Sequence, residues 1–182
     1  MTTLLTNTVP DIPEPADPAS VVLRIGARFT TAARTSGDRI VASRVVSHGA
    51  ILLAASQAAA AGASGAATAR VIRSAAQQVA HSKPFGTSWQ AGGRVLGAAG
   101  VASALVALSA SGGSSATVRQ IREVTDRLGA CWADEKRSGP SQPWIQPMLV
   151  GGAMLEALLE LLGASEIEVE ADLPRATAPI VG

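Results

Sequence analysis

Apolar residues recur at helical spacing over most of the chain. Val22, Ile25 and Phe29 fall on one face of a segment that begins with Pro18, a residue well suited to the first turn of a helix. The pattern predicts an all-α fold, a bundle of about five to six helices with extended amino- and carboxyl-terminal arms. The helices are expected over residues 18–34, 38–82, 93–110, 115–137 and 145–163.

The segment 38–82 is the longest of these predicted helices, and its interior is unusual. Residues 54–69 read AASQAAAAGASGAATA and hold no charge and no aromatic side chain. Gly62 and Gly65 each weaken a helix by about 1 kcal/mol relative to alanine, but the alanines around them are strong helix formers. We favour one long helix, and whether the two glycines kink it or split it stays open.

The two ends of the chain differ from this centre. Residues 1–16 are rich in proline and threonine and show no periodicity, whereas EIEVEADL at 166–173 alternates charged and apolar residues and predicts a short extended or strand-like piece. We therefore expect a flexible amino-terminal arm at 1–16, a helical domain at 17–163 and an acidic carboxyl-terminal arm at 164–182.

Charge is distributed unevenly beneath a net charge of +1. Residues 1–17 sum to −3, residues 18–122 to +10 and residues 123–182 to −6. Thirteen of the 15 basic residues are arginine, which binds phosphate in a bidentate manner. This basic body predicts a polyanionic partner, with nucleic acid, RNA in particular, as the favoured one. The expected contacts are Arg24, Arg28, Arg34, Arg39, Arg44, Arg70, Arg73 and Arg94.

The chain offers few candidates for catalysis. His48 and Cys131, the latter beside Trp132, are interpreted as packing residues, because each falls on an apolar helix face. The glycine-rich stretch GGRVLGAAG at 92–100 lacks the lysine and hydroxyl residue of a phosphate loop. We predict no catalytic residues, no metal, no cofactor and no enzymatic activity.

Self-association is predicted from two kinds of helix face. Small side chains let helix axes approach closely, and a leucine-rich helix face favours packing against another helix. The chain is expected to form at least a dimer. The residues assigned to this contact are Leu155, Leu158, Leu161, Leu162, Gly62 and Gly65.

Membrane insertion is an alternative, because residues 45–69 and 95–118 are uncharged and long enough to span a bilayer. A hairpin of these spans would leave arginines on both sides of the membrane, which disfavours it. A single cysteine and an amino terminus without a signal peptide's basic start and apolar run favour a cytoplasmic protein that is not secreted.

Alanine, serine and proline make up 63 of the 182 residues, and this make-up is seen in the proline-, threonine- and alanine-containing first arm and in the stretch SQAAAAGASGAATA. In this make-up the chain resembles the proline-alanine-serine-rich proteins of polymycoviruses, which are associated with viral double-stranded RNA in place of a capsid. The resemblance implies a self-assembling, coat-like protein that binds nucleic acid without reading its sequence. The alternatives are a membrane or lipid-surface protein and a helical protein-binding adaptor.

Overall fold

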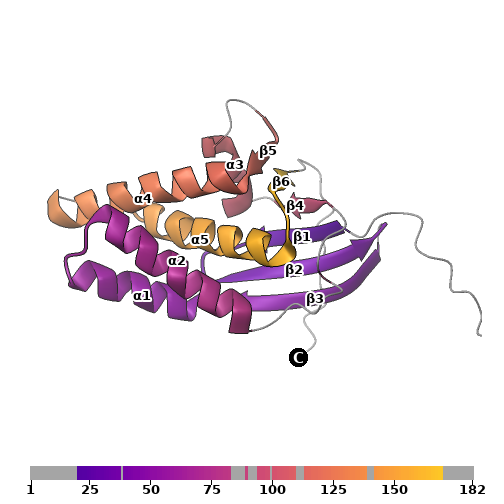
Figure 1. The fold of residues 1–182 in the computed structure, drawn as a ribbon, viewed down its shortest axis with the longest axis horizontal. Helices are drawn as coiled ribbons and strands as arrows, with labels where there is room; N and C mark the ends of the chain where they lie inside the picture. The colour runs from indigo at the N-terminus through magenta and orange to yellow at the C-terminus, as the bar shows by residue number, and fades with distance from the viewer. Residues whose placement is uncertain are drawn as a thin grey trace, which may run out of the picture.

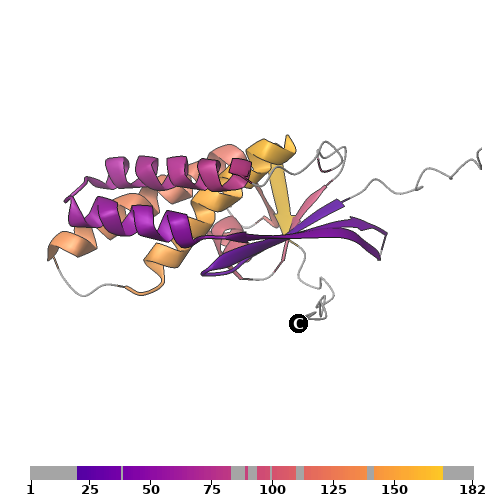
Figure 2. The same ribbon diagram turned by 90° about the horizontal axis from the view of Figure 1, so that it is seen from below.

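The computed structural model describes residues 20–37, 39–82, 89, 94–98, 100–109, 113–138 and 142–169. In this part of the chain a six-stranded mixed sheet packs against helices that gather on one side of it and extend beyond its edge (Figures 1 and 2). The predicted arm at 1–16 and residues 170–182 of the predicted carboxyl-terminal arm lie outside the described residues.

Two kinds of pairing build the sheet, whose strand order is β3-β2-β1-β4-β6-β5. The first three strands form an antiparallel meander, β4 and β6 run parallel to β1, and β5 pairs with β6 in the antiparallel sense. The strands are β1 (Ser20–Ile25), β2 (Phe29–Ser36), β3 (Arg39–Ser47), β4 (Val95–Gly97), β5 (Ser115–Thr117) and β6 (Glu166–Val169).

The helices follow the strands in a regular way. Two of them connect β3 to β4, one connects β4 to β5, and two connect β5 to β6. They are α1 (Gly49–Ala60), α2 (Gly65–Ser82), α3 (Val101–Ser109), α4 (Val118–Ser138) and α5 (Ile145–Leu162).

The expectation of an all-α fold is wrong, because residues 18–34 supply β1 and most of β2 instead of a helix. Val21, Leu23 and Ile25 are buried while Arg24 between them is exposed, which is the alternation of a strand. The apolar residues in this segment fit a period of two as well as a helical one. Their β-branched and aromatic side chains favour the strand.

The single helix expected over 38–82 is also wrong. Residues 39–47 form β3, and the remainder divides into α1 and α2 at Gly62, whose φ is +66°. This left-handed backbone ends α1, and glycine adopts it without strain. The uncharged stretch at 54–69 is therefore two helices and a turn.

The remaining predicted helices and the predicted strand agree with the structure in part. The helix expected at 93–110 is replaced by β4 and α3, with Gly100 at φ +114° between them. The helix expected at 115–137 is confirmed as α4 except for its first three residues, which form β5, and the helix expected at 145–163 is confirmed as α5. The strand-like piece is confirmed over its described part as β6.

Close contact between α2 and α4 explains the small residues at the start of α2. A Cβ built on Gly65 would lie 2.5 Å from the Cα atom of Ala130, and one built on Gly129 would lie 2.9 Å from the Cβ atom of Ala69. Both helices therefore approach backbone to backbone. The small side chains serve packing within one chain.

We predict that Gly65→Ala destabilises the protein, although alanine is the better helix former. The added methyl group meets backbone atoms of Ala130, and overpacking of this kind costs about 1 to 3 kcal/mol. Urea unfolding measures the change in the free energy of unfolding. Ala66→Leu on the exposed side of the same turn is the control and should shift it by no more than about 0.5 kcal/mol. Equal effects of both substitutions would contradict the close contact.

Candidate functional site at the carboxyl edge of the sheet

Four strands end at the same edge of the sheet. The parallel strands β1, β4 and β6 end there, and so does β3, because it is antiparallel to β2 and hence runs in the direction of β1. In open α/β sheets, ligands bind beyond the carboxyl ends of the strands, where successive connections leave in opposite directions. Here β1 lies between β2 and β4. The chain leaves β1 toward β2 on one side, and the connection from β3 through α1 and α2 returns to β4 on the other side.

A tight turn, Gly26–Arg28, follows β1 at this edge. The Gly26 amide donates a hydrogen bond to the Phe29 carbonyl at 2.9 Å, and a Cβ on Gly26 would lie 3.0 Å from that oxygen. The His48 amide donates to the Arg28 carbonyl at 2.9 Å. The turn is therefore fastened to the residue that precedes α1.

The amino terminus of α3 lies on the other side of β1. The Ala98 amide donates to the Leu23 carbonyl at 2.8 Å, and a Cβ on Gly100 would lie 3.6 Å from the Ile25 carbonyl oxygen. Val101 packs so closely on α5 that a Cβ on Gly151 would lie 2.5 Å from its Cγ1. The end of β1 and its turn thus lie between the first turns of α1 and α3.

The electrostatic character of this edge is positive. The first amides of a helix lack intrahelical acceptors and carry the positive end of the helix dipole. Arg24 and Arg28 add two guanidinium groups and are exposed. The described residues of β1, the turn, β2 and β3 contain no aspartate or glutamate. An anion fits this edge, and no metal-binding group of three His, Cys, Asp or Glu occurs among the described residues.

His48 lies buried beneath the turn, with a fully buried side chain. Its Nε2 is 2.8 Å from the Oγ1 atom of Thr30, which is fully buried as well, and its Nδ1 has no hydrogen-bond partner among the described residues. Burial lowers the pKa of His48 below its ordinary value, and the backbone carbonyl of Ala27 opposes that shift. The imidazole is therefore neutral at pH 7.

Sequence reasoning placed His48 inside a helix and did not connect it with a site. Its contacts to Thr30 and Arg28 span 18 and 20 residues of chain and depend on the β2–β3 pairing. Once residues 20–47 are recognised as a three-stranded meander, His48 is seen to lie between the end of β3 and the start of α1. That position is the sequence signal that could have identified it.

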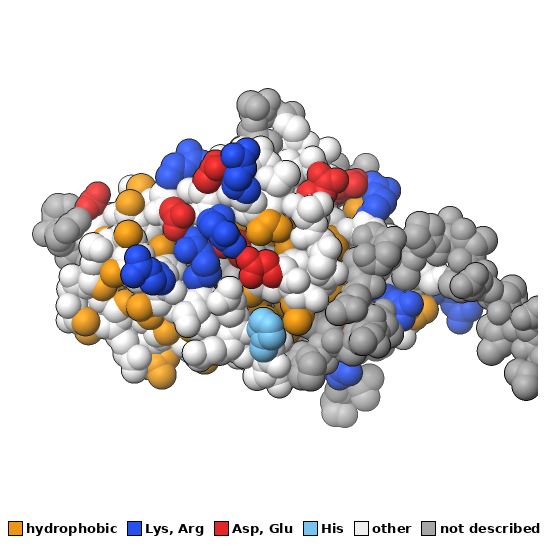
Figure 3. Space-filling view, in the orientation of Figure 1, with side chains coloured by type: hydrophobic (Ala, Val, Ile, Leu, Met, Phe, Trp, Pro, Cys, Tyr) orange, Lys and Arg blue, Asp and Glu red, His pale blue; other side chains and the backbone are white. Residues whose placement is uncertain are grey.

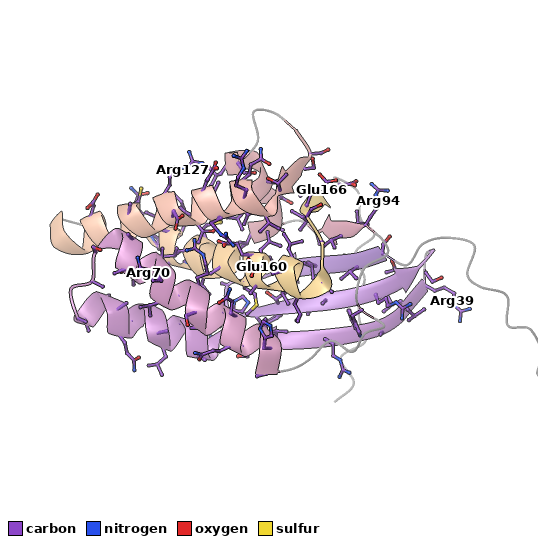
Figure 4. All side chains as sticks on the ribbon, in the orientation of Figure 1. Arg39, Arg70, Arg94, Arg127, Glu160 and Glu166 are labelled. Carbon is purple, nitrogen blue, oxygen red and sulfur yellow. The ribbon has the colours of Figure 1, made fainter. Side chains whose placement is uncertain are left out.

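The eight arginines assigned to nucleic acid do not form one surface. Arg24, Arg28, Arg34, Arg39 and Arg44 lie on the first three strands and the turn. Figure 4 shows Arg39 at the far end of the strands and Arg70 away from it, among the helices. Arg94 is paired with Glu168, whose pKa this guanidinium lowers. Of the whole set, Arg24 and Arg28 lie nearest the carboxyl edge, at the end of β1 and in its turn.

Arg73 belongs to an ion-pair cluster between helices. Glu156 on α5 is 1% exposed, and its Oε2 accepts hydrogen bonds from Arg73 of α2 at 2.9 Å and Arg122 of α4 at 3.1 Å. Arg73 also binds Asp126 at 2.8 Å, and Arg122 binds Glu160 at 2.6 Å. Burial opposes a charged Arg73, but the carboxylates outweigh it and raise its pKa. Charges of both signs therefore alternate across this face (Figure 3).

Most of the residues assigned to self-association make their contacts inside the chain. Leu155, Leu158 and Leu162 are buried and Leu161 is partly buried, all within the core around α5. Gly65 contacts α4, and Gly62 is exposed at the turn after α1.

The expected membrane spans, 45–69 and 95–118, are not continuous helices, because strands and turns interrupt them. One described helix, Ile145–Leu162, is long and apolar enough to cross a bilayer, and 78% of it is buried inside the protein. The membrane alternative therefore gains no support from the structure.

No family model and no curated protein sequence matches the chain, but solved structures match it in fold. The Aquifex aeolicus Ppx/GppA phosphatase in its type II variant has a TM-score of 0.62 and 15% identity over 85% of this chain and 53% of its own. An exopolyphosphatase-like protein has a TM-score of 0.62 and 10% identity, covering 89% and 57%. An exopolyphosphatase from Cytophaga hutchinsonii has a TM-score of 0.51 and 11% identity, covering 85% and 54%.

These likenesses show a shared fold, and the chain spans about half the length of the solved proteins it matches. They overturn the resemblance to polymycovirus proteins, which rested on alanine, serine and proline content that this α/β fold accommodates as well. The predicted coat-like function is not supported, and neither are its two alternatives, a membrane or lipid-surface protein and a helical adaptor, because all three assumed an all-α fold. The expectation of no enzymatic activity loses its support as well, because the solved proteins that share this fold are named as phosphatases and exopolyphosphatases.

We predict that stability falls in mild acid because of His48. The lowered pKa means that the unfolded chain takes up a proton near pH 6.5 before the native protein does. The free energy of unfolding is therefore highest above about pH 6.5 and decreases as the pH falls through the lowered native pKa. Urea unfolding between about pH 7 and 5 measures this. His48→Gln keeps His81 and should flatten the profile, so an unchanged profile would contradict the assignment.

We predict that Glu156→Ala lowers the free energy of unfolding by about 2 kcal/mol. This value is smaller than the usual loss for a fully buried ion pair, because Arg73 and Arg122 are partly exposed to solvent. Glu123→Ala is the matched control, since its ion pair with Arg119 is exposed and spans 4.0 Å. Thermal and urea unfolding compare the two variants. A loss of equal size in both would argue against the buried cluster as the cause.

Proposed function

We propose that this chain is the phosphate-binding lobe of a hydrolase of phosphoanhydrides or phosphate esters. The observation that carries the proposal is the position of the Gly26–Arg28 turn, fastened between the amino termini of α1 and α3 at the carboxyl edge of the sheet. The lobe would bind a phosphate group at this turn.

The chemistry of the edge suits a phosphate group. Helix amino termini bind phosphate through free backbone amides and the helix dipole. Arg28 lies in the turn itself and Arg24 lies one residue before the end of β1, so a guanidinium is available for bidentate contacts. The absence of carboxylates from the described part of β1 to β3 removes the repulsion that an anion would otherwise meet.

The fold supports the same class of ligand. The solved proteins with this arrangement of strands are named as Ppx/GppA phosphatase and exopolyphosphatase, so phosphate groups are the substrates that their names indicate. The chain covers about half of each of them, which fits a protein that supplies one lobe of a larger site.

Hydrolysis needs a group that activates water, usually a carboxylate or a histidine. The described carboxylates lie on α4, α5 and β6, and those of Glu156, Glu160, Asp126 and Glu168 are engaged with arginines. His48 is buried and neutral beneath the turn. We therefore assign binding to this edge and place the group that activates water outside the described residues of the edge.

We predict that the protein binds inorganic tripolyphosphate and that Arg28→Ala weakens the affinity roughly tenfold, as expected for loss of a charge-assisted contact. Isothermal titration calorimetry at fixed ionic strength measures the dissociation constant. Phosphate release by the isolated chain should stay at background.

Arg70→Ala is the matched control, because Arg70 is an exposed arginine on α2 with the same charge. It should leave the affinity within about twofold of the unchanged protein. Equal weakening by both substitutions would indicate unspecific attraction to net charge, and absence of binding would overturn the proposed function.

A further inference from the structure

The Gly26–Arg28 turn is held from below by a small polar unit. It consists of His48, Thr30 and the backbone of Ala27 and Arg28, and both side chains are fully buried. Polar groups buried in this way are costly unless they are hydrogen-bonded, so a fold retains them where their bonds fix a conformation. The unit lies directly beneath the site described above.

Three hydrogen bonds converge on His48. Its amide donates to the Arg28 carbonyl at 2.9 Å, its carbonyl accepts from the Leu52 amide at 2.9 Å, and its Nε2 pairs with Thr30 Oγ1 at 2.8 Å. The first bond reaches the turn, the second starts α1, and the third reaches β2. A single residue thus fixes the turn relative to the first helix and the second strand.

We propose that His48 is a positioning residue, which holds the Gly26–Arg28 turn in one conformation so that the Arg28 side chain is presented to the phosphate group. This role rests on the proposed function. His48 does not touch the ligand, because its side chain is fully buried while Ala27 and Arg28 above it are exposed.

The Thr30 hydroxyl provides the sharpest test, because it is removed without changing the size of the side chain. Thr30→Val leaves Nε2 of His48 without its partner and preserves the β-branched shape in β2. Thr30→Ser keeps the hydroxyl. Thr125→Val is the matched control, since Thr125 is also fully buried and its hydroxyl donates to the Ile121 carbonyl at 2.8 Å within α4.

We expect Thr30→Val to weaken tripolyphosphate binding roughly fivefold to tenfold, as for loss of one hydrogen bond. Hydrogen exchange at the Gly26 and His48 amides should speed up by a similar factor, roughly fivefold to tenfold, because both amides bond to carbonyls at the turn. Thr30→Ser should restore both values. Thr125→Val should lower the free energy of unfolding by a comparable amount. Its affinity for tripolyphosphate and its hydrogen exchange at the Gly26 and His48 amides should equal those of the unchanged protein.

The outcomes separate the two proposals. Unchanged affinity and unchanged exchange in Thr30→Val overturn the role of His48, and so does equal weakening by Thr125→Val, which would indicate general destabilisation. If the unchanged protein fails to bind tripolyphosphate, or binds it independently of Arg28, the proposed function fails. The exchange measurement then decides on its own whether His48 holds the turn.

Discussion

The burial of α5 is the constraint on which the rest of the structure depends. Most residues of this helix are buried, because α2, α4 and α3 pack around it and Ile25 of β1 lies close to Gly151. Gly151 and Gly152 give room to Val101 of α3 and Thr125 of α4. A charged residue at such a centre needs partners, and Glu156 obtains them from Arg73 and Arg122. The helix therefore sets both the apolar core and the ion pairs that tie neighbouring helices together.

The placement of α5 also governs the carboxyl edge of the sheet. Gly151 lets α3 begin close to Ile25, so that the first turn of α3 lies beside the end of β1. On the other side, the β2–β3 pairing brings His48 and the start of α1 to the same turn. The edge that we propose to bind phosphate thus depends on packing contacts that lie deep in the protein, whereas Arg28 itself is an exposed side chain.

The sequence predicted the later part of the fold better than the earlier part. α4 and α5 have long apolar faces with a period that strands cannot share, so their existence and approximate ends were predictable. Residues 20–47 carry apolar positions compatible with both periods, and their pairing is a tertiary effect. The arginines of the carboxyl edge, Arg24 and Arg28, were among the predicted anion contacts. The turn and His48 were not, because strand pairing alone brings those residues together.

The edge strand β3 has a consequence for how copies of the protein meet in solution. It is nine residues long, no other described strand pairs with its outer side, and Val41 and Val45 on it are more than half exposed. An exposed strand of this kind attracts other strands. Arg39, Arg44 and the irregular pairing opposite Arg34 and Thr35 oppose that attraction through charge and shape. The arginines of this strand thus oppose edge-to-edge pairing between copies of the chain, a role that their positive charge fulfils without any ligand.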